Sequence, residues 1–362
     1  MKLKLSQQKV YLINKEIKDS KSLFMKNTIK LAAIALFAAA VFTSCEKDES
    51  EEISYEEDES EEIKFIGIED ISIENYPKVD GATATRALNQ MIACKLLGVD
   101  YIWSESIGGG ERNIYPEYDY WETWEEYFAF CNFLKERIPT SQTHGAYINL
   151  IDGNADLILV SSKPSPDEKA HADETGVTLI QTPIALDAFV FIVNEANPVK
   201  SLTTEQIRKI YTKQITNWSK VGGRDSEMAV YTRPRNSGSE ETLREVVMNG
   251  MEPADFPESA QVQGMGAVFT EISGSEDGIC YTFNNYKEMI AQIPEGIASK
   301  IAVDGVYPEK TTIGNRTYPF TTEVYAVIRS GLDHNSMAYK LYEWLHSKSA
   351  KIVLEECGFS SY

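Results

Sequence analysis

Three segments of the chain combine small, hydroxyl-bearing residues with the start of a predicted helix, and these segments could bind an anion. They are Asp80–Thr85, Ser141–Gly145 and Arg233–Glu240. The first N–H groups of a helix have no partner within it, and the helix dipole is positive at this end, so such a terminus attracts negative charge. Ordinary helix capping is the alternative for each segment taken singly, and Ser237-x-x-Glu240 has the pattern of a capping box.

Arg233 distinguishes the third segment from a simple cap. A guanidinium group recognises tetrahedral oxyanions through forked hydrogen bonds, and Arg233 stands just before Ser237–Gly238–Ser239. Hydrogen bonds to a charged group contribute about 1.5–3 kcal/mol each. Roughly six of them would reach the ~8 kcal/mol of micromolar affinity. The residues therefore predict an oxyanion site that needs no metal and no cofactor.

The elements that must position these segments alternate between short buried strands and amphipathic helices, which is typical of an α/β protein. Continuous apolar runs at Ala155–Ser161 and Asp187–Val193 predict buried strands, and extended runs follow at Asp277–Tyr286 and Tyr318–Arg329. We expect largely parallel sheets. A Trp- and Tyr-rich helix should bury one aromatic face rather than offer a sugar-stacking platform; that face comprises Trp121, Trp124, Phe128, Cys131 and Leu134.

The order of these elements indicates two lobes. We expect residues 64–190 together with 322–362 to form lobe 1, and residues 191–321 to form lobe 2. The extended segments 187–194 and 318–329 would cross between the lobes as a hinge. A chain of 362 residues suits two such lobes better than one.

Charge and composition exclude several classes of partner. With 55 Asp and Glu against 35 Lys and Arg, the chain has a net charge of −20, which disfavours nucleic acid and anionic lipid surfaces. The charge does not exclude a small anion, because exposed charges are screened beyond ~8 Å at physiological salt. No Cys or His spacing indicates a metal site, and the pairing of Cys94, Cys131, Cys280 and Cys357 stays open.

The N-terminal region has the features of an export signal. Residues 1–44 contain eight Lys and include the apolar run Leu31–Phe42, which is too short to span a bilayer. The run ends at Thr43–Ser44–Cys45, which resembles a bacterial lipobox. We therefore predict a signal peptide over 1–44 and lipidation of Cys45. Met25 is an alternative start, so residues 1–24 are either an upstream extension or a long basic n-region.

An acidic tract follows the predicted lipidation site. Residues 46–62 contain eleven acids and one Lys, and such a tract should be disordered because it has almost nothing to bury. We expect residues 45–63 to form a lipidated tether. The tract also resembles the export signal of lipoproteins displayed on the outer surface of some Gram-negative bacteria, so a periplasmic and a surface location both stay open.

Five sequence segments together resemble the PstS-like phosphate-binding proteins of ABC transporters. The series NPV, LT, IY, ITNW, GG, R and NSGS carries most of this similarity. The segments are residues 79–88, 143–160, 183–218, 222–239 and 277–286. The resemblance implies a type II periplasmic-binding-protein fold, with two α/β lobes that clamp a dehydrated phosphate without a metal. It also implies an ABC permease as partner and no catalysis.

The resemblance also implies which residues bind the ligand. They are Thr83, the backbone of Ala84, Thr143, Arg233, Ser237, Gly238 and Ser239. The family usually adds one Asp, whose place falls here at Ser161 or Ser162. An Asp accepts the proton of phosphate and repels sulfate, whereas a hydroxyl does both poorly, so we expect sulfate to compete with phosphate. Arg235 stands where an acidic partner of the site arginine is common, and it either adds affinity or faces solvent.

Three functions follow from these patterns. We expect a monomeric, lipid-anchored binding protein of the cell envelope that captures inorganic phosphate or a related oxyanion for an ABC transporter. The alternative is a surface-exposed oxyanion sensor or adhesin without a transport role. A serine hydrolase using Ser237 or Ser239 is disfavoured, because the chain lacks the G-x-S-x-G motif and a suitably spaced His.

Overall fold

The computed structural model describes residues 64–104, 110–291 and 293–362, which belong to one compact unit, Glu62–Tyr362. The predicted signal peptide (1–44), the Cys45 lipidation site and the tether to residue 63 lie outside the described residues. No helix in the described part is both long and apolar enough to cross a membrane. The four cysteines of the described part are free thiols.

A mixed β-sheet organises the described residues. Its main strands lie in the spatial order β1 (Val79–Gly81), β4 (Leu157–Val160), β11 (Thr321–Arg329), β5 (Leu179–Asn194), β8 (Gly278–Phe283) and β7 (Ala229–Val230). The pairs β1–β4 and β7–β8 are parallel, whereas β11 runs antiparallel to β4 and β5, and β5 runs antiparallel to β8. The expectation of largely parallel sheets is therefore wrong, because the long strands β5 and β11 run against their neighbours.

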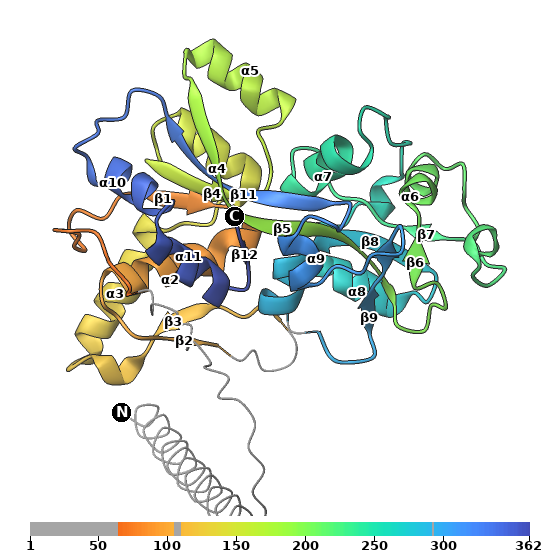
Figure 1. The fold of residues 1–362 in the computed structure, drawn as a ribbon, viewed down its shortest axis with the longest axis horizontal. Coiled ribbons are helices and arrows are strands. Elements are labelled where there is room, and N and C mark those ends of the chain that lie inside the picture. Colours follow the sequence, from red (N-terminus) through yellow and green to blue (C-terminus); the bar gives the residue numbers. More distant parts are fainter. Residues whose placement is uncertain (1–63, 105–109, 292) are drawn as a thin grey trace, which may run out of the picture. The chain divides into compact units, whose positions relative to one another are not determined.

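Strand β5 belongs to both halves of this sheet. Its residues 179–188 pair with β11, and its residues 189–194 pair with β8 and with β9 (Ala298–Lys300). We call β1, β4, β11 and residues 179–188 the first half-sheet, and residues 189–194 with β7, β8 and β9 the second half-sheet. Figure 1 shows β5 passing from one group of helices to the other. The short strand β12 (Ser360–Ser361) also pairs with β5.

The helices gather around the two half-sheets (Figure 1). Those near the first half-sheet are α2 (Arg86–Leu96), α3 (Trp124–Arg137), α4 (Gln142–Ile151), α5 (Pro166–Thr175), α10 (Met337–Trp344) and α11 (Lys348–Glu356). Those near the second are α6 (Thr204–Tyr211), α7 (Gly238–Thr242), α8 (Ala267–Gly274) and α9 (Lys310–Gly314). Two further pairs of strands are β2 (Tyr101–Trp103) with β3 (Ile114–Pro116), and β6 (Ser201–Leu202) with β10 (Ala302–Val303).

Local sequence signals explain several of these elements. Helix α6 begins with a capping box in which Thr203 and Gln206 satisfy each other's backbone N–H groups, and it buries Ile207, Ile210 and Tyr211. The apolar run of β5 is buried from residue 184 to residue 194. One hydrophobic cluster extends through residues of both half-sheets, and a smaller cluster packs α4 against β4. This packing holds the start of α4 close to the end of β4.

The Trp-rich segment that includes helix α3 buries only part of the predicted face. Trp124 and Phe128 are 52% and 57% exposed. Leu134 is buried as predicted, and Phe130 and Phe133 are buried beside it in place of Trp124 and Phe128. Aromatic residues recur at helical spacing on both faces, so periodicity alone could not choose between them. The choice comes from tertiary packing, in which Tyr76 meets Phe133 edge-on at a centroid distance of 5.6 Å.

A buried carboxyl group lies where β5 changes its pairing partner. Asp187 is 2% exposed, and its Oδ1 accepts the backbone N–H groups of Ala188 and Asn285 at 2.7 and 2.9 Å. Its Oδ2 has no hydrogen-bond partner in the described part of the chain. Burial raises the pKa of Asp187 to about 7, although the two backbone N–H groups and the charge of Lys300 act in the opposite direction.

We expect Asp187→Asn to change how stability depends on pH. A folded-state pKa above that of the unfolded chain means that the folded protein binds the extra proton, so wild-type stability should fall as pH rises from about 4 to about 7. Asn does not titrate and can keep Oδ1 as the acceptor. Urea unfolding should therefore show the variant gaining stability relative to wild type over this range. Parallel pH profiles of the two proteins would contradict the prediction.

Candidate functional site

The three predicted helix starts meet at one cavity of about 460 Å³. The segments 82–84, 142–144 and 233–239 line it together with residues 263–265 and Phe283. The first two segments belong to the first half-sheet, and the others come from the second half-sheet and its connections. The cavity thus lies between the two groups of elements, and of the predicted binding residues it is lined by Thr83, Ala84, Thr143, Arg233, Ser237, Gly238 and Ser239.

A buried carboxylate ties the first helix start to the second. Asp80, at 0% exposure, accepts the backbone N–H groups of Gly81 and Ser141 through Oδ1 at 2.7 and 2.9 Å. Its Oδ2 accepts the side-chain amide of Asn149 on α4 at 2.7 Å. The next residue, Gly81, has no room for a side chain, since a Cβ there would lie 2.6 Å from the Asn89 Nδ2 atom. Sequence reasoning included Asp80 in the segment but did not identify this positioning role.

The segments after Asp80 do not begin their helices in the same way. Residues Thr83–Thr85 form a 3₁₀ turn before α2, so Thr83 and Ala84 lie outside the α-helix itself. Helix α4 begins at Gln142, whose φ of 63° places this non-glycine residue in the left-handed region. This backbone turn sets Thr143 in the first turn of α4, where its side chain lines the cavity.

Arg233 is a buried cation without a counter-ion among the described residues. It is 7% exposed, it takes part in no ion pair with the described residues, and its Nε has no hydrogen-bond partner among them. Burial lowers the pKa of the guanidinium. A buried charge is costly unless it is paired and hydrogen-bonded. Because Arg233 lines the cavity, an anion bound there would supply the missing charge.

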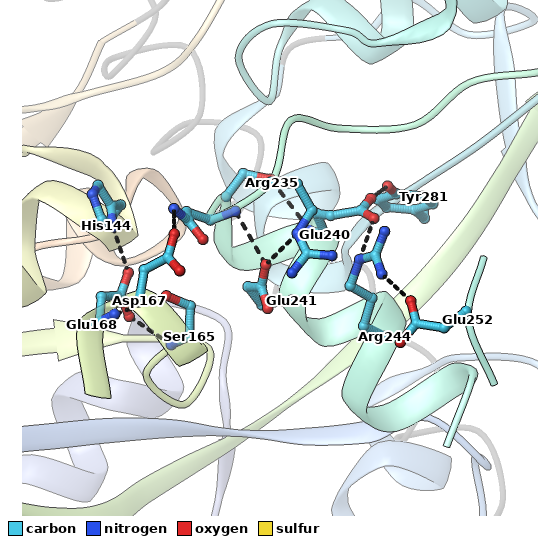
Figure 2. A network of polar contacts seen from close by, with 12 residues as sticks. His144, Ser165, Asp167, Glu168, Arg235, Glu240, Glu241, Arg244, Glu252 and Tyr281 are labelled. Atoms are coloured by element: carbon cyan, nitrogen blue, oxygen red, sulfur yellow. Dashed lines mark hydrogen bonds and ion pairs between the residues drawn. The ribbon is translucent and has the colours of Figure 1, made fainter. Parts of the chain in front are cut away.

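Glu240 is the nearby carboxylate that could have paired with Arg233, but other groups occupy it. Its Oε2 accepts a hydrogen bond from the Tyr281 hydroxyl at 2.5 Å, and its Oε1 accepts one from Arg244 Nε at 2.9 Å (Figure 2). The Tyr281 oxygen in turn accepts the backbone N–H of Arg233 at 2.9 Å. This network holds the Arg233 backbone while leaving its guanidinium group without a carboxylate.

The network also corrects the expected capping box at Ser237. Ser237 Oγ accepts the backbone N–H of Glu240 at 3.3 Å, as an N-cap should. The reciprocal bond is not formed, because the Glu240 carboxylate turns to Tyr281 and Arg244 instead. Ser237 Oγ uses a lone pair for the cap and keeps its own hydrogen for another acceptor. Helix α7 then runs directly into a π-helical segment, Leu243–Val247.

The two sides of the cavity approach each other closely at Gly238. A Cβ on this residue would lie 2.4 Å from Thr143 Oγ1 and 3.0 Å from Ser162 Oγ. Two polar contacts also join the segments on either side of the cavity. Lys163 Nζ contacts Glu245 Oε1, and Asn236 Nδ2 donates to Asp167 Oδ2, both at 2.7 Å. Glycine is therefore required at this point for the backbone of α7 to approach the hydroxyl groups.

The predicted residues Ser161 and Ser162 lie in a neighbouring cavity of about 240 Å³. Both Oγ atoms are buried without a hydrogen-bond partner in the described part. Neither residue lines the larger cavity, although Ser162 Oγ comes close to Gly238 as described above. Their role as ligand-binding residues stays a prediction.

The larger cavity is lined by two guanidinium groups and one imidazole but by no carboxylate among the described residues. No described Asp or Glu lines it, whereas Arg233, Arg235 and His144 do. Arg235 is largely exposed, and its Nε lies 3.8 Å from Glu241 Oε1. Sequence reasoning missed His144, which immediately follows Thr143. Its carboxylate partner Glu168 stands 24 residues further along the chain, so spacing offered no signal for the pair.

Comparisons with known proteins identify the fold of the chain that forms this site. The PBP superfamily domain matches residues 135–349, which is more than half of the chain, and the chain belongs to this superfamily. This range includes Thr143 and the Arg233–Glu240 segment but not Asp80–Thr85. The matched domain and its structural neighbours have the type II periplasmic-binding fold, which confirms the fold class expected from the sequence.

Two solved structures illustrate the likeness. One is a putative phosphate ABC transporter substrate-binding protein from Clostridium perfringens with bound phosphate, at 22% identity and a TM-score of 0.55; the match covers 78% of this chain and 98% of that one. The other is an ABC-type phosphate transport receptor from Vibrio cholerae, at 21% identity and a TM-score of 0.53; the match covers 78% of this chain and 99% of that one. At these identities the likeness establishes the fold.

Curated relatives confirm the resemblance to PstS-like proteins. The phosphate-binding protein PstS of Borreliella burgdorferi is 26% identical over 184 residues, which cover 49% of this chain and 64% of the relative. The PstS of Bacillus subtilis is 24% identical over 208 residues, which cover 57% of this chain and 63% of the relative. The similarity thus spans a little less than two thirds of each relative.

We expect Gly238→Ala to weaken oxyanion binding. The new methyl group would force Thr143 or the α7 backbone to move, and such overpacking costs about 1–3 kcal/mol. Calorimetry should show at least about a tenfold loss of phosphate affinity. Gly274→Ala is a matched control, because nothing lies within 4 Å of the added Cβ and its φ is not positive. Wild-type affinity in Gly238→Ala would show that the ligand does not bind at this approach.

Proposed function

We propose that this chain is an extracytoplasmic solute-binding protein that captures inorganic phosphate, or a similar tetrahedral oxyanion, for an ABC transporter. The observation that carries the proposal is the uncompensated Arg233 guanidinium, buried in a cavity lined by hydroxyl groups and helix starts. The names of the PstS relatives and the phosphate-bound neighbour support the choice of phosphate. The proposed activity is binding and delivery, without a chemical reaction.

The proposed ligand set follows from the lining of the cavity. Arg233 would supply charge and forked hydrogen bonds. The hydroxyls of Thr83, Thr143, Ser237 and Ser239 and the backbone at Ala84 and Gly238 would supply the remaining donors. Ser161 and Ser162 would complete the set if the cavity rearranges around the ligand. The proposed ligand groups come from both half-sheets, which supports two lobes. Lobe 1 would comprise residues 64–190 with 322–362, and lobe 2 residues 191–321. The lobes would close over the anion by a hinge movement at β5 and β11.

The location of the protein is part of the proposal. A signal peptide over residues 1–44, a lipidated Cys45 and an acidic tether to residue 63 would place the binding domain at the surface of a bacterial membrane. The tether would allow the domain to diffuse near an ABC permease without spanning the bilayer. The protein would act as a monomer in the cell envelope.

We expect Arg233→Ala to lower phosphate affinity by at least about tenfold, because a hydrogen bond to a charged group contributes about 1.5–3 kcal/mol. Calorimetry of the purified full chain measures this directly. Arg235→Ala serves for comparison and should cost less, since an exposed ion pair contributes about 0–1 kcal/mol. If Arg233→Ala bound phosphate as tightly as wild type, the site assignment would be wrong.

The acidic tract after Cys45 favours a second candidate, a surface-exposed oxyanion sensor or adhesin that binds the anion but does not deliver it. Phosphate uptake separates the two functions. For a transport protein, deleting the gene should reduce high-affinity phosphate uptake severalfold, and the Arg233→Ala gene should fail to restore it. Normal uptake in the deletion strain, together with phosphate binding by the purified protein, would favour the sensor or adhesin.

A further inference from the structure

Discrimination between phosphate and sulfate requires a hydrogen-bond acceptor in the site. Near neutral pH, inorganic phosphate still carries a P–OH proton, whereas sulfate has none. An acceptor pairs with the phosphate proton but faces a bare oxygen of sulfate, and a buried polar group left without a partner is costly. No described Asp or Glu lines the cavity, so the acceptor must be another group. This inference rests on the proposed function.

His144 offers such an acceptor. His144 lines the cavity and its side chain is 45% exposed, which leaves it accessible to a ligand. Its Nδ1 lies 2.9 Å from Glu168 Oε1, and Figure 2 shows the ring directed at this carboxylate. The other ring nitrogen, Nε2, has no hydrogen-bond partner within the described ranges. One nitrogen is thus held by the protein while the other is available.

Glu168 is held in place as the hydrogen-bond partner of His144. Its side chain is 1% exposed, and its Oε2 accepts the backbone N–H of Ser165 at 2.7 Å within the capping box that starts α5. Burial raises the pKa of Glu168, although hydrogen bonds from Ser165 and His144 act in the opposite direction. In its ionised form a carboxylate oxygen can only accept, so Oε1 then requires a hydrogen on His144 Nδ1. In a neutral imidazole with its hydrogen on Nδ1, Nε2 is an acceptor.

We propose that His144 Nε2 accepts the P–OH hydrogen bond of monohydrogen phosphate, and that Glu168 fixes the tautomer that makes this possible. His144 thereby determines specificity for phosphate over sulfate, in place of the one carboxylate missing at residue 161 or 162, and sulfate should compete less than the missing Asp alone predicts. The charged groups near the ring are Glu168 and Asp167 of α5 and the guanidinium groups of Arg233 and Arg235. Asp167 is engaged by Asn236 and leaves Glu168 as the partner of the ring.

Glu168→Gln tests the tautomer directly. Because the Ser165 N–H needs an acceptor, the amide oxygen of Gln should take the place of Oε2, which turns the NH₂ group toward His144 Nδ1. Nδ1 must then accept, and the ring hydrogen moves to Nε2. The substitution thus converts the proposed acceptor, Nε2, into a donor, with almost no change in size.

The experiment is calorimetry of the full chain with phosphate and with sulfate at about pH 8, where free imidazole is neutral and phosphate is mainly the monohydrogen dianion. We expect Glu168→Gln to bind sulfate more tightly than wild type does, and the ratio of phosphate to sulfate affinity to fall at least about tenfold. His144→Ala should also lower this ratio. His171→Ala is the matched control, because His171 pairs with Asp152 and does not line the cavity.

The outcomes separate this inference from the proposed function. An unchanged ratio in both Glu168→Gln and His144→Ala, with phosphate still bound, would overturn the role of His144 and leave the proposed function intact. Wild-type protein that binds no phosphate would overturn both. If Glu168→Gln fails to fold, ¹⁵N NMR of the wild-type His144 ring decides the matter: a hydrogen on Nδ1 supports the proposal, and a hydrogen on Nε2 in the neutral ring contradicts it.

Discussion

The site depends on one electrostatic constraint, a guanidinium group buried without a carboxylate partner among the described residues. Removing an ion from water costs several kcal/mol in a protein even after relaxation. Glu240 is buried close by in the chain and could have neutralised Arg233, but Tyr281 and Arg244 occupy both of its oxygens. The protein thus keeps a positive charge unpaired at a cavity, where a bound anion can pair with it.

The carboxylates that shape the site lie behind its lining rather than in it. Asp80 holds the backbone before α4, Glu240 acts through Tyr281 on the Arg233 backbone, and Glu168 orients the His144 ring. Each is satisfied by donors from the protein. The surface that meets a ligand is therefore dominated by hydrogen-bond donors, and an anion can bind inside a chain whose net charge is −20. Contact distances decide the ligand, whereas the net charge acts over longer distances and is screened.

The arrangement of the sheet explains why this cavity takes its walls from both sides. Because β5 pairs with β11 and then with β8 and β9, one continuous strand joins the half-sheet whose strands contact α4 to the half-sheet whose strand β8 contacts α7. Gly238 and Thr143 come from these two helices and approach each other closely. A small change in the relative position of the two half-sheets would separate donors that must bind the same anion. The geometry of β5 is therefore part of the site.

Much of the fold could be predicted because its signals are local. The buried strands, the start of α6 at Thr203 and the three hydroxyl-bearing segments all follow from short patterns of apolar, capping and small residues. The inward face of α3 and the antiparallel direction of β5 and β11 could not be predicted in this way. Both depend on which distant element packs against the segment, and periodicity carries no information about that partner.

The sequence by itself determined the residue types of the site, the position of Arg233 beside Ser237–Gly238–Ser239, and the α/β class, since these depend on neighbours along the chain. Only the tertiary structure decided that Arg233 has no carboxylate partner in the described part, that Glu240 turns to Tyr281, and that Glu168 meets His144. These outcomes join residues that are far apart in sequence, and they follow from how the two half-sheets pack rather than from any local pattern.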